Sequence, residues 1–549
     1  MAFLDSLRNH PLGVRLAQLA PSRAWGQRPR LFFILCTVTV VSSLLLGGGT
    51  RGGFLSDTIL ELIAIPAFLA SLSSLVALPR SENKQRAEWP LMLCLAIAAL
   101  PLVQLVPLPP WLWTALPNRD QMVTVFGVLG HELPWLPISV SPTATWVSVL
   151  SLLPPLAIFL GVIQLSYRER RVMSLIFIAV GIVAAFVGLA QVAQGPGSPL
   201  RFFTVTNESE AVGFFANRNH FAALLYSLLL FGAAWATNVA FTVGSWSDRK
   251  SFETSTVAML TGCFLGLVIL IVTESITRSR AGLALTIIAV AGALALPLAD
   301  RRRSAGGVTP VRLILASASL AIVLAVQFAL YRILDRFADD PLADSRVTFA
   351  RNTIAAAKAY MPFGSGVGTF VSVYPTFELP QDAISNAFVN HAHDDLLEVW
   401  LEGGVISLCL MAAFASWFLL RAAKIWWRAP DTMRAIDLLL ARAATIAVPL
   451  IIAHCVVDYP LRTGAIMAVF AFSCALLIAP LAPAWHETAV EPAKAREPTM
   501  ATVSPAAPAR VPAAADGADT AAAKTQPQPK GRWGEDVEWP DQWRNDSHE

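Results

Sequence analysis

Charged residues are scarce in this chain. Of its 549 residues, 55% are hydrophobic and only 14% are charged, whereas a soluble domain carries roughly 25% charged residues. This composition excludes an ordinary soluble protein and indicates an integral membrane protein. The formal net charge of +3 is too small to suggest a nucleic-acid partner, and the position of the charges matters more than their sum.

The chain also lacks cysteines in loops. Its six cysteines all lie inside apolar runs, at Cys36, Cys94, Cys263, Cys409, Cys455 and Cys474. We therefore expect small buried side chains rather than disulfides or a CxxC metal site. A cleavable signal peptide is not expected either, because the basic segment before the first apolar run is too long and no A-x-A site follows it.

Long apolar runs are abundant. A hydrocarbon core about 30 Å thick requires ~20 apolar residues per helix, and this measure predicts about twelve spans. They begin near Leu31, Asp57, Trp89, Trp146, Val172, His220, Thr256, Ala281, Val311, Gly403, Asp437 and Gly464. The predicted fold class is an all-α polytopic membrane protein. Around residues 275–280, two of the spans could instead form one broken helix.

The loops between the spans alternate in charge. Every second loop is short and basic, for example "SYRERR", "SDRKS" and "DRRRS", while the loops between them are richer in Trp and Pro. Basic loops face the cytoplasm by the positive-inside rule. Both termini are therefore expected in the cytoplasm, and the other set of loops outside.

Four segments follow from this pattern: a basic cytoplasmic N-terminus at 1–30, a transmembrane domain at 31–481, a long external loop at 331–398 and a disordered cytoplasmic tail at 482–549. The external loop contains a predicted helix with Asp344 or Ser345 as N-cap and Pro362 as terminator, which would form an ordered lid. The Ala-, Pro- and Thr-rich tail cannot bury a core. Its Trp-rich end could dock to a cytoplasmic partner or simply be a sticky disordered end.

Polar residues at the outer ends of spans are the candidates for chemistry, because ionisable groups at membrane depth are costly. The stretch "GFFANRNHFAALL" places Arg218, Asn219 and His220 at the entrance of one span, and Arg278 and Arg280 lie at another. The planar guanidinium group suits phosphate oxygens. Snorkelling at a helix end, or pairing of Arg278 with an acid one turn earlier, would also explain the arginines.

The stretch "NHAHDDLLEVWLEGG" at residues 390–404 is the most polar of these entrances. His391, His393 and Asp395 begin a zinc-hydrolase signature, but Leu396 stands where that signature requires another histidine. We therefore expect no metal. A single histidine held by an acid is instead a candidate general base.

Asp394, Glu398 and Glu402 continue this stretch at helical spacing, so a stripe of carboxylates is expected beside the base. A solvated helix start explains the same acids without any chemistry, because acids favour the positive end of a helix. Near the end of the chain, His454 and Asp458 are four residues apart and could orient each other. The glycine-rich "MPFGSGVGTF" does not follow a strand, so a tight external turn is expected rather than a dinucleotide site.

In their order along the chain, these motifs resemble the O-antigen ligase and polymerase family of bacterial envelope glycosyltransferases. The resemblance covers about residues 146–480 and includes "FANRNHFA", "RSRAGL" and "PFGSGVGTF". The family signature is a histidine, then an amide or serine, nine further residues and a glycine. His393 and Gly404 reproduce this spacing.

The chain departs from the family pattern at two places. Asp394 stands where the family usually has Asn, Ser or Gln, and an acid there would raise the pKa of His393 by stabilising its charged form. Ahead of "GFFANRNHFA", where many ligases have an arginine, this chain has Glu210 and Ala211.

The resemblance implies a type C glycosyltransferase fold and a cofactor-free, metal-independent, inverting transfer on the periplasmic side of the inner membrane. The donor would be a glycan on undecaprenyl diphosphate, and the acceptor a glycan or a lipid. By position, His393 would act on the acceptor hydroxyl, and Arg280 would hold the diphosphate. The other candidates would bind substrate (Arg218, Asn219, His220, Arg278, Arg346 and His391) or support the site (Asp394, Glu398, Glu402, Gly404, His454 and Asp458). A transporter or flippase of lipid-linked saccharides is the alternative.

Overall fold

The computed structural model describes residues 29–50, 55–77, 82–204, 206–244, 254–298, 311–320, 342–383, 389–427 and 433–481. Within these ranges, nine helices are long and apolar enough to cross a membrane, and three shorter apolar helices accompany them at 30–46, 311–320 and 464–476. Every predicted span start falls within one of these helices. The prediction of an all-α, multi-pass membrane protein is therefore confirmed.

The helices of the bundle are α3 (Pro29–Leu46), α4 (Leu55–Ala77), α5 (Glu82–Gln104), α8 (Pro142–Ser151), α9 (Leu153–Val162), α10 (Tyr167–Gln194), α11 (Arg218–Gly244), α12 (Thr254–Thr277), α13 (Arg280–Leu298), α17 (Asp395–Trp427), α18 (Ala435–Cys455) and α19 (Gly464–Leu476). Helices α8 and α9 together form one span. Outside the bundle lie α6 (Pro110–Trp113), α7 (Asp120–Val128), α15 (Leu342–Ala359) and α16 (Phe370–Val373).

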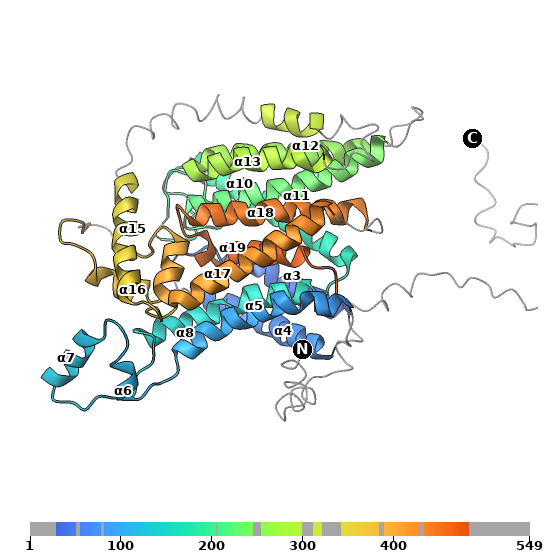
Figure 1. Cartoon of the computed structure of the whole chain (residues 1–549). Helices are drawn as coiled ribbons and strands as arrows, with labels where there is room; N and C mark the ends of the chain where they lie inside the picture. Colours follow the sequence, from blue (N-terminus) through green and yellow to red (C-terminus); the bar gives the residue numbers. More distant parts are fainter. Residues whose placement is uncertain are drawn as a thin grey trace, which may run out of the picture. The chain divides into compact units, whose positions relative to one another are not determined.

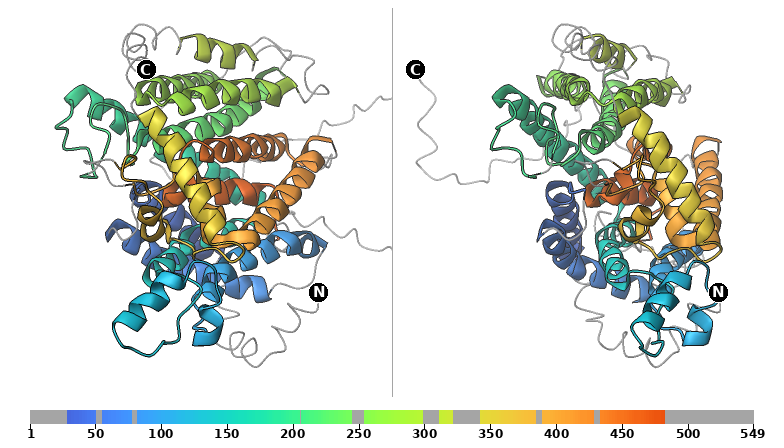
Figure 2. Two further views of the ribbon diagram at one scale, coloured as in Figure 1. Left: turned by 60° about the vertical axis from the view of Figure 1, so that its left-hand side comes forward. Right: turned by 90° about the vertical axis from the view of Figure 1, so that its left-hand side faces the viewer.

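The bundle helices run side by side, and α15 lies across one end of them (Figure 1). The short helices α6, α7 and α16 lie at the same end, and the turned views show α15 crossing the ends of the long helices (Figure 2). We call this the site end, because α11, α13 and α17 all begin here with the polar motifs of the sequence.

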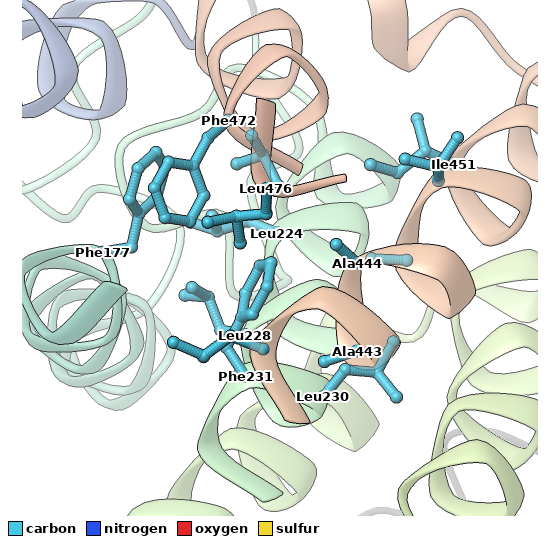
Figure 3. Packing of buried hydrophobic residues seen from close by; sticks show 14 of the residues in the cluster. Phe177, Leu224, Leu228, Leu230, Phe231, Ala443, Ala444, Ile451, Phe472 and Leu476 are labelled. Carbon is cyan, nitrogen blue, oxygen red and sulfur yellow. The ribbon is translucent and has the colours of Figure 1, made fainter. Parts of the chain in front are cut away.

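Helix α11 forms the centre of the bundle, packed against α12, α13 and α18. Leu224, Leu228 and Phe231 of α11 face Phe177 of α10 and Phe472 of α19 (Figure 3). The outer helices instead expose large apolar side chains, as a helix that is hydrophobic all round does in a membrane.

The opposite end of the bundle is fixed by a buried arginine. Arg170 donates hydrogen bonds to the carbonyl oxygens of Val162, Ile163 and Ile478, at 2.6 to 2.9 Å. These carbonyls end α9 and follow α19, where helices leave acceptors unsatisfied and favour a positive charge. Arg170 of the basic "SYRERR" segment therefore stabilises this end of the bundle.

Three helix boundaries refine the sequence predictions. Helices α12 and α13 are separate, because Arg278 between them has a left-handed φ of 53°. Helix α15 begins at Leu342, before the predicted cap at Asp344 or Ser345. Helix α17 begins at Asp395 rather than at Gly403, since its first acids are neutralised by a distant arginine described below. The basic N-terminus and the Trp-rich tail lie outside the described residues.

Candidate functional site

Gly404 breaks α17 about two and a half turns after the polar start of the helix at Asp395. Its φ of 57° and ψ of −142° are open to glycine but costly for other residues. A Cβ atom at Gly404 would lie 2.1 Å from the carbonyl oxygen of Pro362. The break exposes backbone groups of α17 that need partners.

The glycine-rich turn supplies these partners. The N–H groups of Ser365 and Gly366 donate to the carbonyl oxygens of Leu401 and Glu402, both at 3.0 Å, and Val405 N–H donates to Pro362 at 2.9 Å. A Cβ atom at Gly364 would lie 2.4 Å from the carbonyl oxygen of Glu402. "PFGSGVGTF" therefore fills the break in α17, which explains why Gly404 and this turn occur together.

His393 lies just before α17 with an unusual backbone. Its φ is 53°, a left-handed conformation that costs energy for a residue with a Cβ. The side chain is 25% exposed, and Nδ1 lies 3.3 Å from Oδ1 of Asp458. Its ring stacks on Phe349 of α15 and meets the edge of Tyr459.

Asp458 is a buried carboxylate at the centre of the site, with a side chain only 1% exposed. Asn219 Nδ2 donates a hydrogen bond to it, His220 Nε2 lies 3.8 Å away, and Arg346 Nη2 lies 4.0 Å away. Burial by itself would raise the pKa of Asp458, but His220 and His393 hold that pKa well below its usual value. Asp458 is therefore an anion that contacts side chains at the starts of α11, α15 and α17.

A second buried carboxylate, Glu210, lies between two arginines. Arg218 Nη1 at the start of α11 is 3.0 Å from Glu210 Oε1, and Arg278 Nη1 is 3.9 Å from the same oxygen. The structure thus pairs Arg278 with Glu210, in another segment, rather than with an acid on its own helix. Arg280 begins α13 with an exposed side chain.

A third group surrounds Arg462, in the turn after α18. Its guanidinium lies 3.1 Å from Asp395, 3.5 Å from Glu398 and 2.9 Å from Glu402. Burial lowers the pKa of Arg462, but the three carboxylates more than offset this and raise it above the ordinary value. Of the expected stripe of Asp394, Glu398 and Glu402, the two glutamates do face one cation, Arg462, but the third carboxylate bound to it is Asp395.

His391 contacts the group around Arg462 and does not join His393 at Asp458. Its Nδ1 lies 2.9 Å from Glu398 Oε1 and its Nε2 lies 3.3 Å from the carbonyl oxygen of Thr50. The rings of His391, His393 and His220 all pack on Tyr459, with centroids 4.3 to 4.9 Å apart. Within the described residues, no group of three His, Cys, Asp or Glu side chains is placed to hold a metal ion.

The structure bears on two alternatives that the sequence left open. Asp394 caps α17, because its Oδ1 accepts the N–H groups of Leu396 and Leu397 at 3.0 Å, and the carboxylate that faces His393 is Asp458. The His454 ring faces the Tyr226 hydroxyl at 3.3 Å. Helix α18 ends at Cys455, and Asp458 lies in the turn that follows it.

Sequence reasoning did not assign roles to Glu210, Arg462, Tyr459 or Thr50. Arg462 had a detectable signal, because it follows Asp458 by four residues and is the cation nearest the end of a span. The sequence drew attention to Glu210 only because many ligases have an arginine at this place. Thr50 contributes a backbone carbonyl, which leaves no signal in its side chain.

Part of the chain matches a known protein family. Residues 265–427 match a family model described as O-Antigen ligase. The match contains Arg278, Arg280, Arg346, the glycine-rich turn and the stretch from His391 to Gly404. A comparison with curated proteins finds no match. Residues 265–427 are therefore similar to the O-antigen ligase family, which suggests a glycan-transferring enzyme of envelope polysaccharide synthesis.

Proposed function

We propose that this protein transfers a glycan from undecaprenyl diphosphate to an acceptor hydroxyl at the site end, on the periplasmic side of the bacterial inner membrane. The main support is the first turn of α11. There Arg218 points to Glu210, which Arg278 also approaches, while the next residues, Asn219 and His220, point to Asp458. The start of α11 thereby contacts both the arginine cluster and the carboxylate that faces His393.

His393 is the proposed base. With Nδ1 directed at Asp458, the ring is oriented so that Nε2 can take the proton of the acceptor hydroxyl. The buried anion then stabilises the imidazolium that forms, as the carboxylate does in other acid–histidine pairs. Asp458 acts through His393 and is a positioning residue.

Arg280, Arg218 and Arg278 are proposed to hold the diphosphate. Arg280 opens α13, where the positive end of the helix adds to its own charge. As the acceptor oxygen bonds to the anomeric carbon, the bond from that carbon to the phosphate oxygen breaks. Undecaprenyl diphosphate leaves with the electron pair, and the arginines stabilise its charge.

The attack and departure occur on opposite faces of the anomeric carbon, so the transfer is proposed to invert its configuration. Positive charge comes from arginines, and we propose that no metal is required. The acidic groups on α17 are already bound by Arg462, which supports this assignment. Ligase and polymerase reactions share these steps and differ in the acceptor.

The test is a reconstituted transfer reaction. Purified protein in vesicles receives an undecaprenyl-diphosphate glycan and a panel of glycan and lipid acceptors, with and without chelator. We expect transfer with inverted configuration at the new bond, and no effect of the chelator. Movement of the lipid-linked glycan across the vesicle without transfer to any acceptor would replace this proposal with a transporter.

The proposed orientation has its own test, because the charge pattern of the loops supports it independently. A cysteine introduced at Val347, an exposed position of α15, should react with a membrane-impermeant reagent added from the periplasmic side. A cysteine at Trp427, exposed at the far end of α17, should react only from the cytoplasmic side. The reverse labelling would contradict the orientation, with cytoplasmic termini, that we propose.

A further inference from the structure

His391 connects two segments that lie far apart in the sequence. On one side its Nδ1 meets Glu398 of α17, and on the other its Nε2 meets the carbonyl oxygen of Thr50, in the turn after α3. Asn390 Nδ2 donates to the same carbonyl at 3.0 Å. The loop that leads into His393 is thereby fastened to a turn that lies outside the matched family domain.

The two partners determine the protonation state of His391. A backbone carbonyl can only accept a hydrogen bond. Glu398 also accepts Ala392 N–H at 3.0 Å and lies 3.5 Å from the Arg462 guanidinium, so its carboxylate is ionised and accepts as well. An imidazole can donate from both nitrogens only when it carries a positive charge.

The turn on the far side is a firm anchor. Gly47 O accepts Ala465 N–H, and Gly48 O accepts Ala216 N–H, both at 2.9 Å. A Cβ atom at Gly48 would lie 2.0 Å from the Phe214 oxygen. The Gly47–Thr50 turn therefore fits directly against the backbones that lead into α11 and α19.

We propose that His391 is a positively charged positioning residue that fastens the His393 loop to the Gly47–Thr50 turn. This holds His393 in its left-handed backbone conformation, which needs support from its surroundings, and keeps it facing Asp458. The assignment replaces substrate binding by His391. It rests on the proposed function in one respect, that His393 is the base.

The surroundings of His391 agree with a positive charge. Glu398 and Asp395 face it from α17, Arg462 and Tyr459 from the turn after α18, and His220 from α11. Burial lowers the pKa of His391, but Glu398 more than offsets this, so the pKa lies above its ordinary value. A raised folded-state pKa gives stability that is complete below the unfolded value of about 6.5. This stability is lost as the pH rises through the folded-state value.

The first test measures stability and needs no substrate. Thermal unfolding midpoints are compared from pH 6 to 9.5 for the wild type, His391→Gln and the control His131→Gln, which changes an exposed histidine. We expect the wild type to be more stable than His391→Gln at pH 6, and this difference to shrink as the pH rises. His131→Gln should follow the wild type. A difference that stays constant with pH would overturn the positive charge.

The second test measures transfer. Because misplacing a catalytic group by about 1 Å can cost up to about 10²-fold in rate, His391→Gln should lower kcat by about 10- to 100-fold and leave the KM for donor and acceptor unchanged. Asn390→Ala, which keeps the imidazolium, should lower kcat less. A raised KM with unchanged kcat in His391→Gln would show direct substrate contact and overturn the proposal.

The two tests separate this inference from the proposed function. If the pH-dependent stability difference is present but the wild type transfers no glycan, the role of His391 as a fastener stands and the proposed function fails. If the wild type transfers glycan but His391→Gln shows neither the stability difference nor the loss of kcat, the proposed function stands and this inference fails.

Discussion

Two of the three charged clusters at the site end contain the same residue types but differ in how fully their charges are paired. Around Arg462, three carboxylates meet one arginine and His391, and each carboxylate has a cation within 3.5 Å. Around Asp458, a single carboxylate meets His393, His220, Asn219 and Arg346. The first cluster has more carboxylates than cations, whereas the second has several hydrogen-bond donors around one carboxylate.

The second difference is exposure. The Arg462 side chain is 18% exposed and its partners are nearly fully buried, whereas His393 is 25% and Arg346 is 41% exposed. In the first cluster the carboxylates outnumber the arginine, which leaves no positive charge for an anionic substrate, so this closed cluster stabilises an arrangement of helices. A partly open cluster, with a histidine aimed at a buried anion, can also exchange a proton with a substrate. We therefore propose that the cluster around Arg462 stabilises the fold and that the cluster around Asp458 takes part in the reaction.

The largest expected effect tests the closed cluster. Arg462→Ala leaves the buried carboxylates of Asp395 and Glu402 without their cation, and breaking a buried ion pair in this way costs about 3–5 kcal/mol. Denaturant unfolding in mixed micelles measures this loss. The matched control is Arg351→Ala, because the Arg351–Asp382 pair has a 60% exposed arginine and such surface pairs contribute only about 0.2–1 kcal/mol. Equal losses in the two variants would remove the distinction between the clusters.

A smaller effect, on rate rather than stability, is expected in the open cluster. Asp458→Asn keeps the shape of the side chain but removes the charge that orients His393 and stabilises its protonated form. We expect kcat to fall by about 10²-fold, within the usual contribution of acid–base catalysis, with KM unchanged. Asp120→Asn, at an exposed position of α7, serves as control. An unchanged kcat for Asp458→Asn would mean that Asp458 is structural, like the carboxylates around Arg462.

The smallest effect concerns the break in α17 at Gly404. Gly404→Ala forces a Cβ atom to within 2.1 Å of Pro362 O and a backbone conformation that costs about 1–3 kcal/mol. Thermal unfolding should show this loss. Gly262→Ala in α12, where a Cβ atom meets nothing within 4 Å, should keep the stability or raise it by up to about 1 kcal/mol, because alanine is favoured over glycine inside a helix. A harmless Gly404→Ala would show that the break is not required.

The spans could be predicted from the sequence because the length of an apolar run is set by the bilayer. The start of α17 could not, because its acids are tolerated only through Arg462, 67 residues from Asp395. Such distant compensation is invisible to a local count of hydrophobic residues.

The candidate site was predictable where a motif marks a helix start, as for Arg218, Arg280 and His393. The partners of these residues were not, because they depend on which helix ends meet. The spacing of Asp458 suggested His454 as a possible partner, whereas its carboxylate faces His393, which enters from another helix start. The contribution of Thr50 could not be predicted at all, because only its backbone takes part.

The most direct test of this account compares His393→Ala with His391→Gln and His131→Ala in the reconstituted transfer reaction, under single-turnover conditions with the folded state verified. We predict that His393→Ala lowers the transfer rate by about 10²–10⁴-fold, that His391→Gln lowers it less, and that His131→Ala keeps the wild-type rate. A His393→Ala protein that is folded and transfers glycan at the wild-type rate would contradict the assignment of the open cluster as the catalytic site.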